Sequence, residues 1–181
     1  RNAAADGVDE VRTGGGLSNF GVNLVKECNN LGIVIDLAHL SPKGIQDVLE
    51  ITESPVVATH ANCHTLMPHP RNLTDTQLER IASQDGVVGI TPVPPFLGEN
   101  PEFSELDVLL DHMDHMVSIM GVDGVGLGMD FDGVGDKRVR DIEDVSKLPN
   151  ITKGLAERGY DKGAIKNILG GNFMRVFSLV W

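Results

Sequence analysis

Four short apolar segments alternate along the chain with longer segments of helical periodicity. The apolar segments cover residues 33–37, 55–60, 86–93 and 124–133. Short runs rich in β-branched residues predict buried strands, whereas apolar positions spaced three and four residues apart predict helices. Strands that alternate with helices indicate an α/β fold with a parallel sheet, and strands that are apolar on both faces fit such a sheet.

Capping residues predict where the helices begin and end. Four hydroxyl side chains precede periodic segments and are the predicted N-caps: Ser18, Ser41, Thr74 and Ser104. Pro42 suits a first helical position, Gln77 completes a capping box with Thr74, and Gly32 ends the first helix. Three shorter helices are predicted at about residues 150–158, 161–169 and 172–180. Residues 1–16 are predicted to form a loop.

The number of strand–helix units limits the architecture. A closed (β/α)8 barrel takes about 250 residues, whereas this chain has 181 residues and four units. No Gly-x-Gly-x-x-Gly motif follows a strand and no P-loop is present, so the sequence lacks the fingerprint of a nucleotide-binding fold. Half a barrel would leave two strand edges unpaired. We therefore interpret residues 1–181 as one half of a single barrel domain.

Composition and charge exclude several classes of protein. The chain has 26 acidic and 15 basic residues and a net charge of −11, which disfavours nucleic acid as a partner. No apolar run reaches the length of about 20 residues that crosses a bilayer, and no signal peptide is visible, so a cytoplasmic location is the default expectation. Cys28 and Cys63 are too few for a disulfide scaffold, although one disulfide stays open.

Three polar side chains stand at the ends of predicted strands. His39, His60 and Asp130 each follow an apolar run. Because the carboxyl ends of parallel strands meet at one edge, we expect these side chains to converge. Imidazoles and carboxylates are zinc ligands. Either histidine alone would equally suit a hydrogen-bonded core imidazole, but two on successive strands, with an aspartate on a third, favour a metal site.

Other candidate residues have plainer interpretations. Arg71, in the loop after the second strand, suits a substrate carboxylate, although a surface arginine is the better interpretation of this residue by itself. We expect His64 and His69, in the same loop, to be solvated. His112 and His115 are expected on a half-exposed helix flank. A further acidic residue inside the first apolar run, Asp36, has no place that the sequence defines; it could orient a ligand.

The ordered set of motifs resembles a known family. The segments "GLSNFGVNLVKECNNLGIVIDLAHLS", "PVVATHANCHTLMPHPRNLTD", "LLDHMDHM", "GVGLGMDFDG", "IEDVSKLPN" and "ILGGNFMRVF" are similar to the membrane (renal-type) dipeptidases, zinc peptidases of the amidohydrolase superfamily. The resemblance implies a (β/α)8 TIM-barrel-like metal-dependent hydrolase fold. It implies that this chain, residues 1–181, supplies about strands 5–8 with their helices, the C-terminal half of the barrel domain.

The resemblance also implies a chemistry. It implies two zinc ions bridged by a water, with His39 and His60 as metal ligands. Asp130 would be the catalytic residue that handles protons, and Arg71 would bind the free C-terminal carboxylate of a dipeptide substrate. The family's His-x-Asp ligand pair and its bridging glutamate do not appear in this chain, so we expect the chain alone to be inactive.

Alternatives to a zinc-dependent dipeptidase stay open at this stage. One is a non-catalytic relative or a binding module that keeps the fold for association. Another is an amidohydrolase that acts on lactams or lactones, against which the carboxylate-binding Arg71 argues. The expected partners are dipeptides, and the sequence leaves open whether the chain forms a homo-oligomer.

Overall fold

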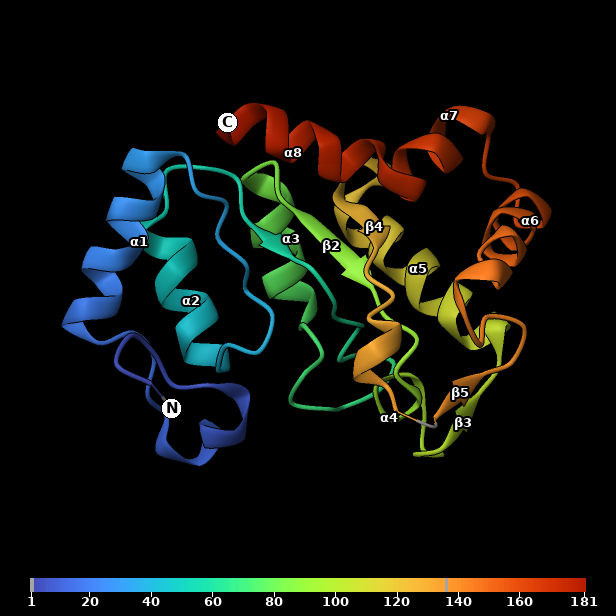
Figure 1. Ribbon diagram of the computed structural model, residues 1–181, viewed down its shortest axis with the longest axis horizontal. Coiled ribbons are helices and arrows are strands. Elements are labelled where there is room, and N and C mark those ends of the chain that lie inside the picture. The colour runs from blue at the N-terminus through green and yellow to red at the C-terminus, as the bar shows by residue number, and fades with distance from the viewer. Residues whose placement is uncertain (1, 136) are drawn as a thin grey trace.

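The computed structural model describes residues 2–135 and 137–181 (Figure 1). The α-helices are α1 (Asn19–Leu31), α2 (Pro42–Ile51), α3 (Asp75–Ser83), α4 (Pro94–Leu97), α5 (Leu106–Met120), α6 (Pro149–Glu157), α7 (Lys162–Lys166) and α8 (Asn172–Val180). The strands are β1 (Val57–Ala58), β2 (Val87–Ile90), β3 (Phe103–Ser104), β4 (Val125–Leu127) and β5 (Arg138–Val139). Short irregular helices are η1 (Val8–Thr13), η2 (Val122–Gly124), η3 (Phe131–Gly133), η4 (Val145–Lys147) and η5 (Asn167–Gly171).

Strands β1, β2 and β4 form a parallel sheet in that order. The expected strand at 33–37 is reduced to a single bridge between Asp36 and Val57. Two hydrogen bonds hold it there, from Leu37 N–H to the Val57 carbonyl (2.7 Å) and from Val57 N–H to the Ile35 carbonyl (3.0 Å). The segment is thus the outer member of the sheet, and a short edge strand of this kind limits pairing with other chains.

Alternate residues of the strands pack against different helices. Val88 and Ile90 of β2 belong to the main core, which also includes residues of α2, α3 and α5. Val87 points to the other face, where it packs with Val57 and with Val176 of α8. In Figure 1, α8 lies across the starting ends of β2 and β4. The opposite ends of these strands are left clear for the side chains that follow them.

The predicted caps of the first three helices are confirmed. Ser18 and Ser41 accept hydrogen bonds from the backbone N–H groups three residues on, at 3.1 and 3.0 Å. Thr74 and Gln77 form the expected capping box. Ser104 is not a cap, because it lies in β3, and α5 begins at Leu106.

Three further differences concern segments without a strong local pattern. The expected loop over residues 1–16 contains η1. Strands β3 and β5 pair in a second small parallel sheet that no sequence pattern indicated. The last helices lie near their predicted places, but α7 and α8 are joined through the π-helical turn η5 rather than separated by a break.

The parallel α/β arrangement is confirmed, but the described residues do not close into a barrel. The main sheet has an open edge at 33–37 and another at β4. Neither Cys28 nor Cys63 forms a disulfide. Within the described part of the chain, none of the helices combines the length and hydrophobicity needed to span a bilayer.

Candidate metal and substrate site

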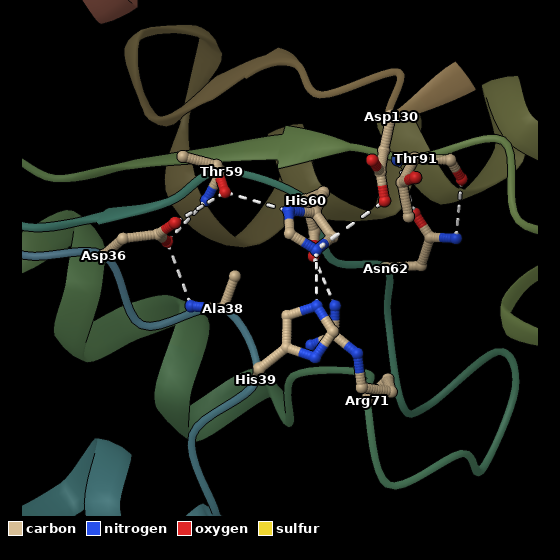
Figure 2. A network of polar contacts seen from close by, with 9 residues as sticks. All are labelled: Asp36, Ala38, His39, Thr59, His60, Asn62, Arg71, Thr91 and Asp130. Carbon is tan, nitrogen blue, oxygen red and sulfur yellow. Dashed lines mark hydrogen bonds and ion pairs between the residues drawn. The ribbon is translucent and has the colours of Figure 1, made fainter. Parts of the chain in front are cut away.

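Side chains from separate strand ends meet at the carboxyl edge of the sheet (Figure 2). The Nε2 atoms of His39 and His60 are 3.0 Å apart. The Oδ2 atom of Asp130 is 3.9 Å from the His60 Nε2 atom. The imidazole rings meet edge to face at an interplanar angle of 61°. The structure therefore brings together the three residues that the sequence placed at strand ends, although His39 and Asp130 are exposed rather than buried.

Two of these residues have unusual backbone conformations. His39 has a φ of 68° and Asp130 a φ of 45°, both in the left-handed region. This region is costly for side chains other than glycine, and such residues cluster at functional sites. His39 lies in a turn closed by a hydrogen bond from Leu40 N–H to the Leu37 carbonyl (3.2 Å). The two turns aim both side chains at the same point above the sheet.

The paired imidazoles fit a single cation. Two nitrogen ligands at about 2.0–2.1 Å from a zinc ion lie about 2.8–3.4 Å apart for angles near 90–110°, which includes the observed 3.0 Å. Partial desolvation lowers the pKa of His39, and the Arg71 charge lowers it further. The neutral imidazole is the form that binds metals. The described residues contain no group of three or more histidine, cysteine, aspartate or glutamate side chains around one point.

The segment after His60 is fixed to the neighbouring strand. The side chain of Asn62, which is fully buried, donates to the Thr91 carbonyl at 2.9 Å and accepts from Thr91 N–H at 3.0 Å. Behind His60, Thr59 links the imidazole to Asp36 (Figure 2). Sequence patterns did not single out Thr59 or Asn62. The only signal available was their position next to a candidate ligand.

Arg71 is half-buried beside the two histidines. Its guanidinium lies over the ring of Phe96, 5.5 Å from the centroid, and its Nη2 atom is 3.5 Å from the His60 carbonyl. Burial lowers the pKa of Arg71, but an arginine stays charged at neutral pH. The long contact to His60 is its one side-chain hydrogen bond among the described residues. The other N–H groups of the guanidinium have no hydrogen-bond partner among the described residues.

His69 differs from the expected solvated side chain. Its Nδ1 atom accepts a hydrogen bond from Arg71 N–H at 3.1 Å, and its ring packs on Phe96 at a centroid distance of 4.5 Å. Burial and the Arg71 charge lower the pKa of His69. The residue therefore supports the loop that carries Arg71.

The expectation of a half-exposed flank is wrong for His112. Its side chain is 1% exposed, because α5 packs against the loop that follows β1. The neighbouring His115 is partly exposed and binds Asp75, with 2.8 Å between Nε2 and Oδ1. Both histidines thus hold α5 against other elements: His112 binds the backbone of Cys63, and His115 binds Asp75 of α3. Neither contact involves His39 or His60.

A groove of about 380 Å³ adjoins the site. Its lining includes Thr59, His60, Asp130 and Phe173. The groove has room for a small molecule next to the imidazoles.

Comparisons with known proteins point to one family. A family model described as "Membrane dipeptidase (Peptidase family M19)" matches residues 1–180. A Klebsiella pneumoniae protein from the 5′ region of pqqA is 40% identical over 172 residues, which are 93% of this chain and 63% of that protein. The dipeptidase tcpJ of Claviceps purpurea is 36% identical over 161 residues, which are 89% of this chain and 38% of that enzyme.

Solved structures give the same result. A metallo peptidase from Rhodobacter sphaeroides, liganded with a phosphinate mimic of the dipeptide L-Ala-D-Ala, superposes with a TM-score of 0.87 and 37% identity. The match covers 92% of this chain and 48% of that structure. The chain thus spans between about two fifths and three fifths of the length of the relatives it matches.

Proposed function

The chain belongs to the membrane dipeptidase family, peptidase family M19, and we propose on this premise that it carries part of the active site of a zinc-dependent dipeptidase. The observation that carries the proposal is the 3.0 Å separation of the His39 and His60 Nε2 atoms. Two imidazole nitrogens at that distance can both bind one zinc ion and so supply two of its ligands. The Rhodobacter sphaeroides relative, crystallised with a dipeptide mimic, supports a dipeptide as the substrate class.

Each side chain has a role in the proposal. His39 and His60 would hold zinc, which when bound would polarise a carbonyl and lower the pKa of a water to about 7. Asp130 lies 3.9 Å from His60 with its carboxylate partly exposed. From that place it takes a proton from the attacking water and delivers one to the leaving amine. Arg71 binds the free carboxylate of the dipeptide with its unused N–H groups.

The site needs ligands beyond those described. A catalytic zinc takes about three protein ligands, whereas the described residues supply a pair of imidazoles and a carboxylate nearby. The matched relatives are longer than the aligned region. We infer that the barrel, the zinc pair and the dipeptide pocket are completed by residues that correspond to the part of those relatives that this chain does not match.

Zinc content and dipeptide hydrolysis of the intact protein test this proposal. We expect His39→Ala and His60→Ala each to lose zinc from one site and to reduce kcat at least about 100-fold, because a ligand is removed from the metal. His64→Ala is the matched control, since this loop histidine is not in contact with the paired imidazoles and should change neither quantity. Normal zinc content and turnover in both ligand variants would contradict the proposal.

The role of Arg71 has its own measurement. Arg71→Ala should raise KM for free dipeptides about 10–100-fold, because a charge-assisted hydrogen bond contributes about 1.5–3 kcal/mol. The same substitution should leave hydrolysis of C-terminally amidated dipeptides unchanged, since these lack the carboxylate. An equal loss on both substrates would show that Arg71 supports the fold rather than the substrate.

A further inference from the structure

The carboxylate of Asp36 is held by three hydrogen bonds (Figure 2). Its Oδ1 atom accepts from the N–H groups of Ala38 and Thr59, both at 3.0 Å. Its Oδ2 atom accepts from the Thr59 hydroxyl at 2.7 Å. Asp36 therefore ties the outer segment of the sheet to Thr59, the residue that precedes His60.

The hydroxyl of Thr59 connects this carboxylate to the imidazole. Its Oγ1 atom is 2.9 Å from the Nδ1 atom of His60. A hydroxyl has one hydrogen, and an ionised carboxylate can only accept. The Thr59 hydrogen therefore points to Asp36, and the hydrogen of the second contact comes from His60 Nδ1. A neutral imidazole protonated at Nδ1 has a bare lone pair at Nε2.

We propose that Asp36 and Thr59 are positioning residues that fix the Nδ1–H form of His60 and aim its Nε2 lone pair at the cation position next to His39. The metal part of this inference rests on the proposed function, whereas the protonation pattern stands on the contacts alone. In the metal-free chain, His39 Nε2 donates to His60 Nε2 across 3.0 Å. Substitution of partners that orient a metal ligand in this way typically weakens metal binding about 10–100-fold.

A simpler role for Asp36 would be to close the local turn through Ala38 N–H. Thr59→Val separates the two roles, because it removes the hydroxyl but keeps both backbone N–H contacts of Asp36. Thr59→Ser is the matched control, since it restores the hydroxyl. Asp36→Asn is a second variant. Its side-chain oxygen can still accept from the N–H groups of Ala38 and Thr59, but it presents an NH2 group to the Thr59 hydroxyl. The Thr59 hydrogen is then released to His60 Nδ1, so the imidazole changes to its Nε2–H form.

Ring-nitrogen NMR spectra of the full metal-free chain measure the protonation pattern directly. We expect His60 to carry its hydrogen on Nδ1 in the wild type and in Thr59→Ser. In Asp36→Asn the hydrogen should move to Nε2, and in Thr59→Val the Nδ1–H form should no longer dominate. Zinc titration of the intact protein against a competing chelator should then show about 10–100-fold weaker binding in Thr59→Val and Asp36→Asn, with Thr59→Ser close to the wild type.

The two readouts separate this inference from the proposed function. An unchanged Nδ1–H form in both Thr59→Val and Asp36→Asn would overturn the inference, whatever the zinc titration gives. Equal zinc affinity in all four proteins would overturn its metal part. If the wild type binds no zinc but Thr59→Val and Asp36→Asn change which nitrogen of His60 carries the hydrogen, the assigned hydrogen-bond pattern is supported and the zinc proposal is contradicted.

Discussion

At the scale of single residues, two backbone groups fix the state of His112. Its Nδ1 atom accepts from Cys63 N–H at 3.1 Å, and its Nε2 atom lies 3.2 Å from the Leu97 carbonyl, to which it donates. This pair of contacts uses both nitrogens of a neutral imidazole. Burial also lowers the pKa of His112. Protonation would place a hydrogen on Nδ1 against the Cys63 donor.

The neutral state of His112 predicts the pH dependence of stability. A histidine in the unfolded chain has a pKa of about 6.5, above that of folded His112, so the unfolded state takes up the proton first as the pH falls. The stabilisation is fully present above pH 6.5 and is lost as the pH falls through 6.5 towards the folded pKa. We expect urea unfolding to show a smaller loss of stability between pH 7 and pH 5 in His112→Asn.

The same variant has an effect at neutral pH. His112→Asn leaves the buried Leu97 carbonyl unpaired, which should cost about 1–3 kcal/mol. His64→Asn is the control, because it removes a histidine that is not buried and should keep the wild-type pH slope. Identical slopes in all three proteins would show that His112 does not carry this dependence.

Residue roles were predictable only where a local pattern marked them. His39, His60 and Asp130 stand directly after apolar runs, and the structure brings them together. Burial of His112 and the contact of His69 with Arg71 depend on segments far away in the sequence or on loop shape. No spacing rule reports such contacts.

At the scale of elements, two glycines let the ends of the strands approach each other. Gly89 lies on β2 and Gly128 just after β4, and both face the Thr59 carbonyl. A Cβ atom at Gly128 would overlap the Thr59 carbonyl oxygen, and one at Gly89 would also meet it. The absence of side chains here brings the segment of Thr59 and His60 close to Asp130.

Gly128→Ala should therefore disturb this edge of the sheet. We expect it to lower the free energy of unfolding by about 1–3 kcal/mol, as overpacking against backbone does, measured by urea denaturation. Gly98→Ala is the matched control, because nothing lies within 4 Å of its Cβ position and its φ of −165° is open to any residue. We expect the control to stay within about 0.5 kcal/mol of the wild type. Equal stability of the two variants would contradict this account.

Helix ends were predicted better than strands. The caps of α1, α2 and α3 are local hydrogen bonds within four residues, so the sequence carries their whole signal. The β3–β5 pair joins Phe103 to Arg138, and its two strands are short. Such a pairing depends on which segments come together, and it leaves no periodic pattern to read.

At the scale of the whole molecule, α8 presents an apolar face to solvent. Phe177 stacks on Trp181 at a centroid distance of 5.0 Å, and Trp181 is 82% exposed. Met174, which is 62% exposed, lies one turn before Phe177 on the same face. Exposed apolar faces next to open sheet edges favour association.

Trp181, the single tryptophan of the chain, reports on this face. In the dilute chain we expect the emission and fast acrylamide quenching of a solvent-exposed indole. With rising concentration the emission should shift to the blue and the quenching should slow, as association covers the face. Met174→Lys should move this shift to at least about tenfold higher concentration, because a charge is costly to bury.

The control for this test adds the same charge elsewhere. Thr76→Lys changes an exposed position of α3 and should keep the wild-type concentration dependence. A blue shift that is unchanged in Met174→Lys would show that α8 is not the associating face.

The sequence by itself determined the alternation of strands and helices, the caps of the early helices and the family. These features rest on local periodicity, on caps whose partners lie within four residues, and on ordered motifs, all of which are specified by residues close together in the sequence. Tertiary structure alone decided the 3.0 Å approach of the His39 and His60 Nε2 atoms, the link from Asp36 to His60 through Thr59, and the pairing of β3 with β5. Those outcomes depend on packing between distant segments, which local patterns do not encode.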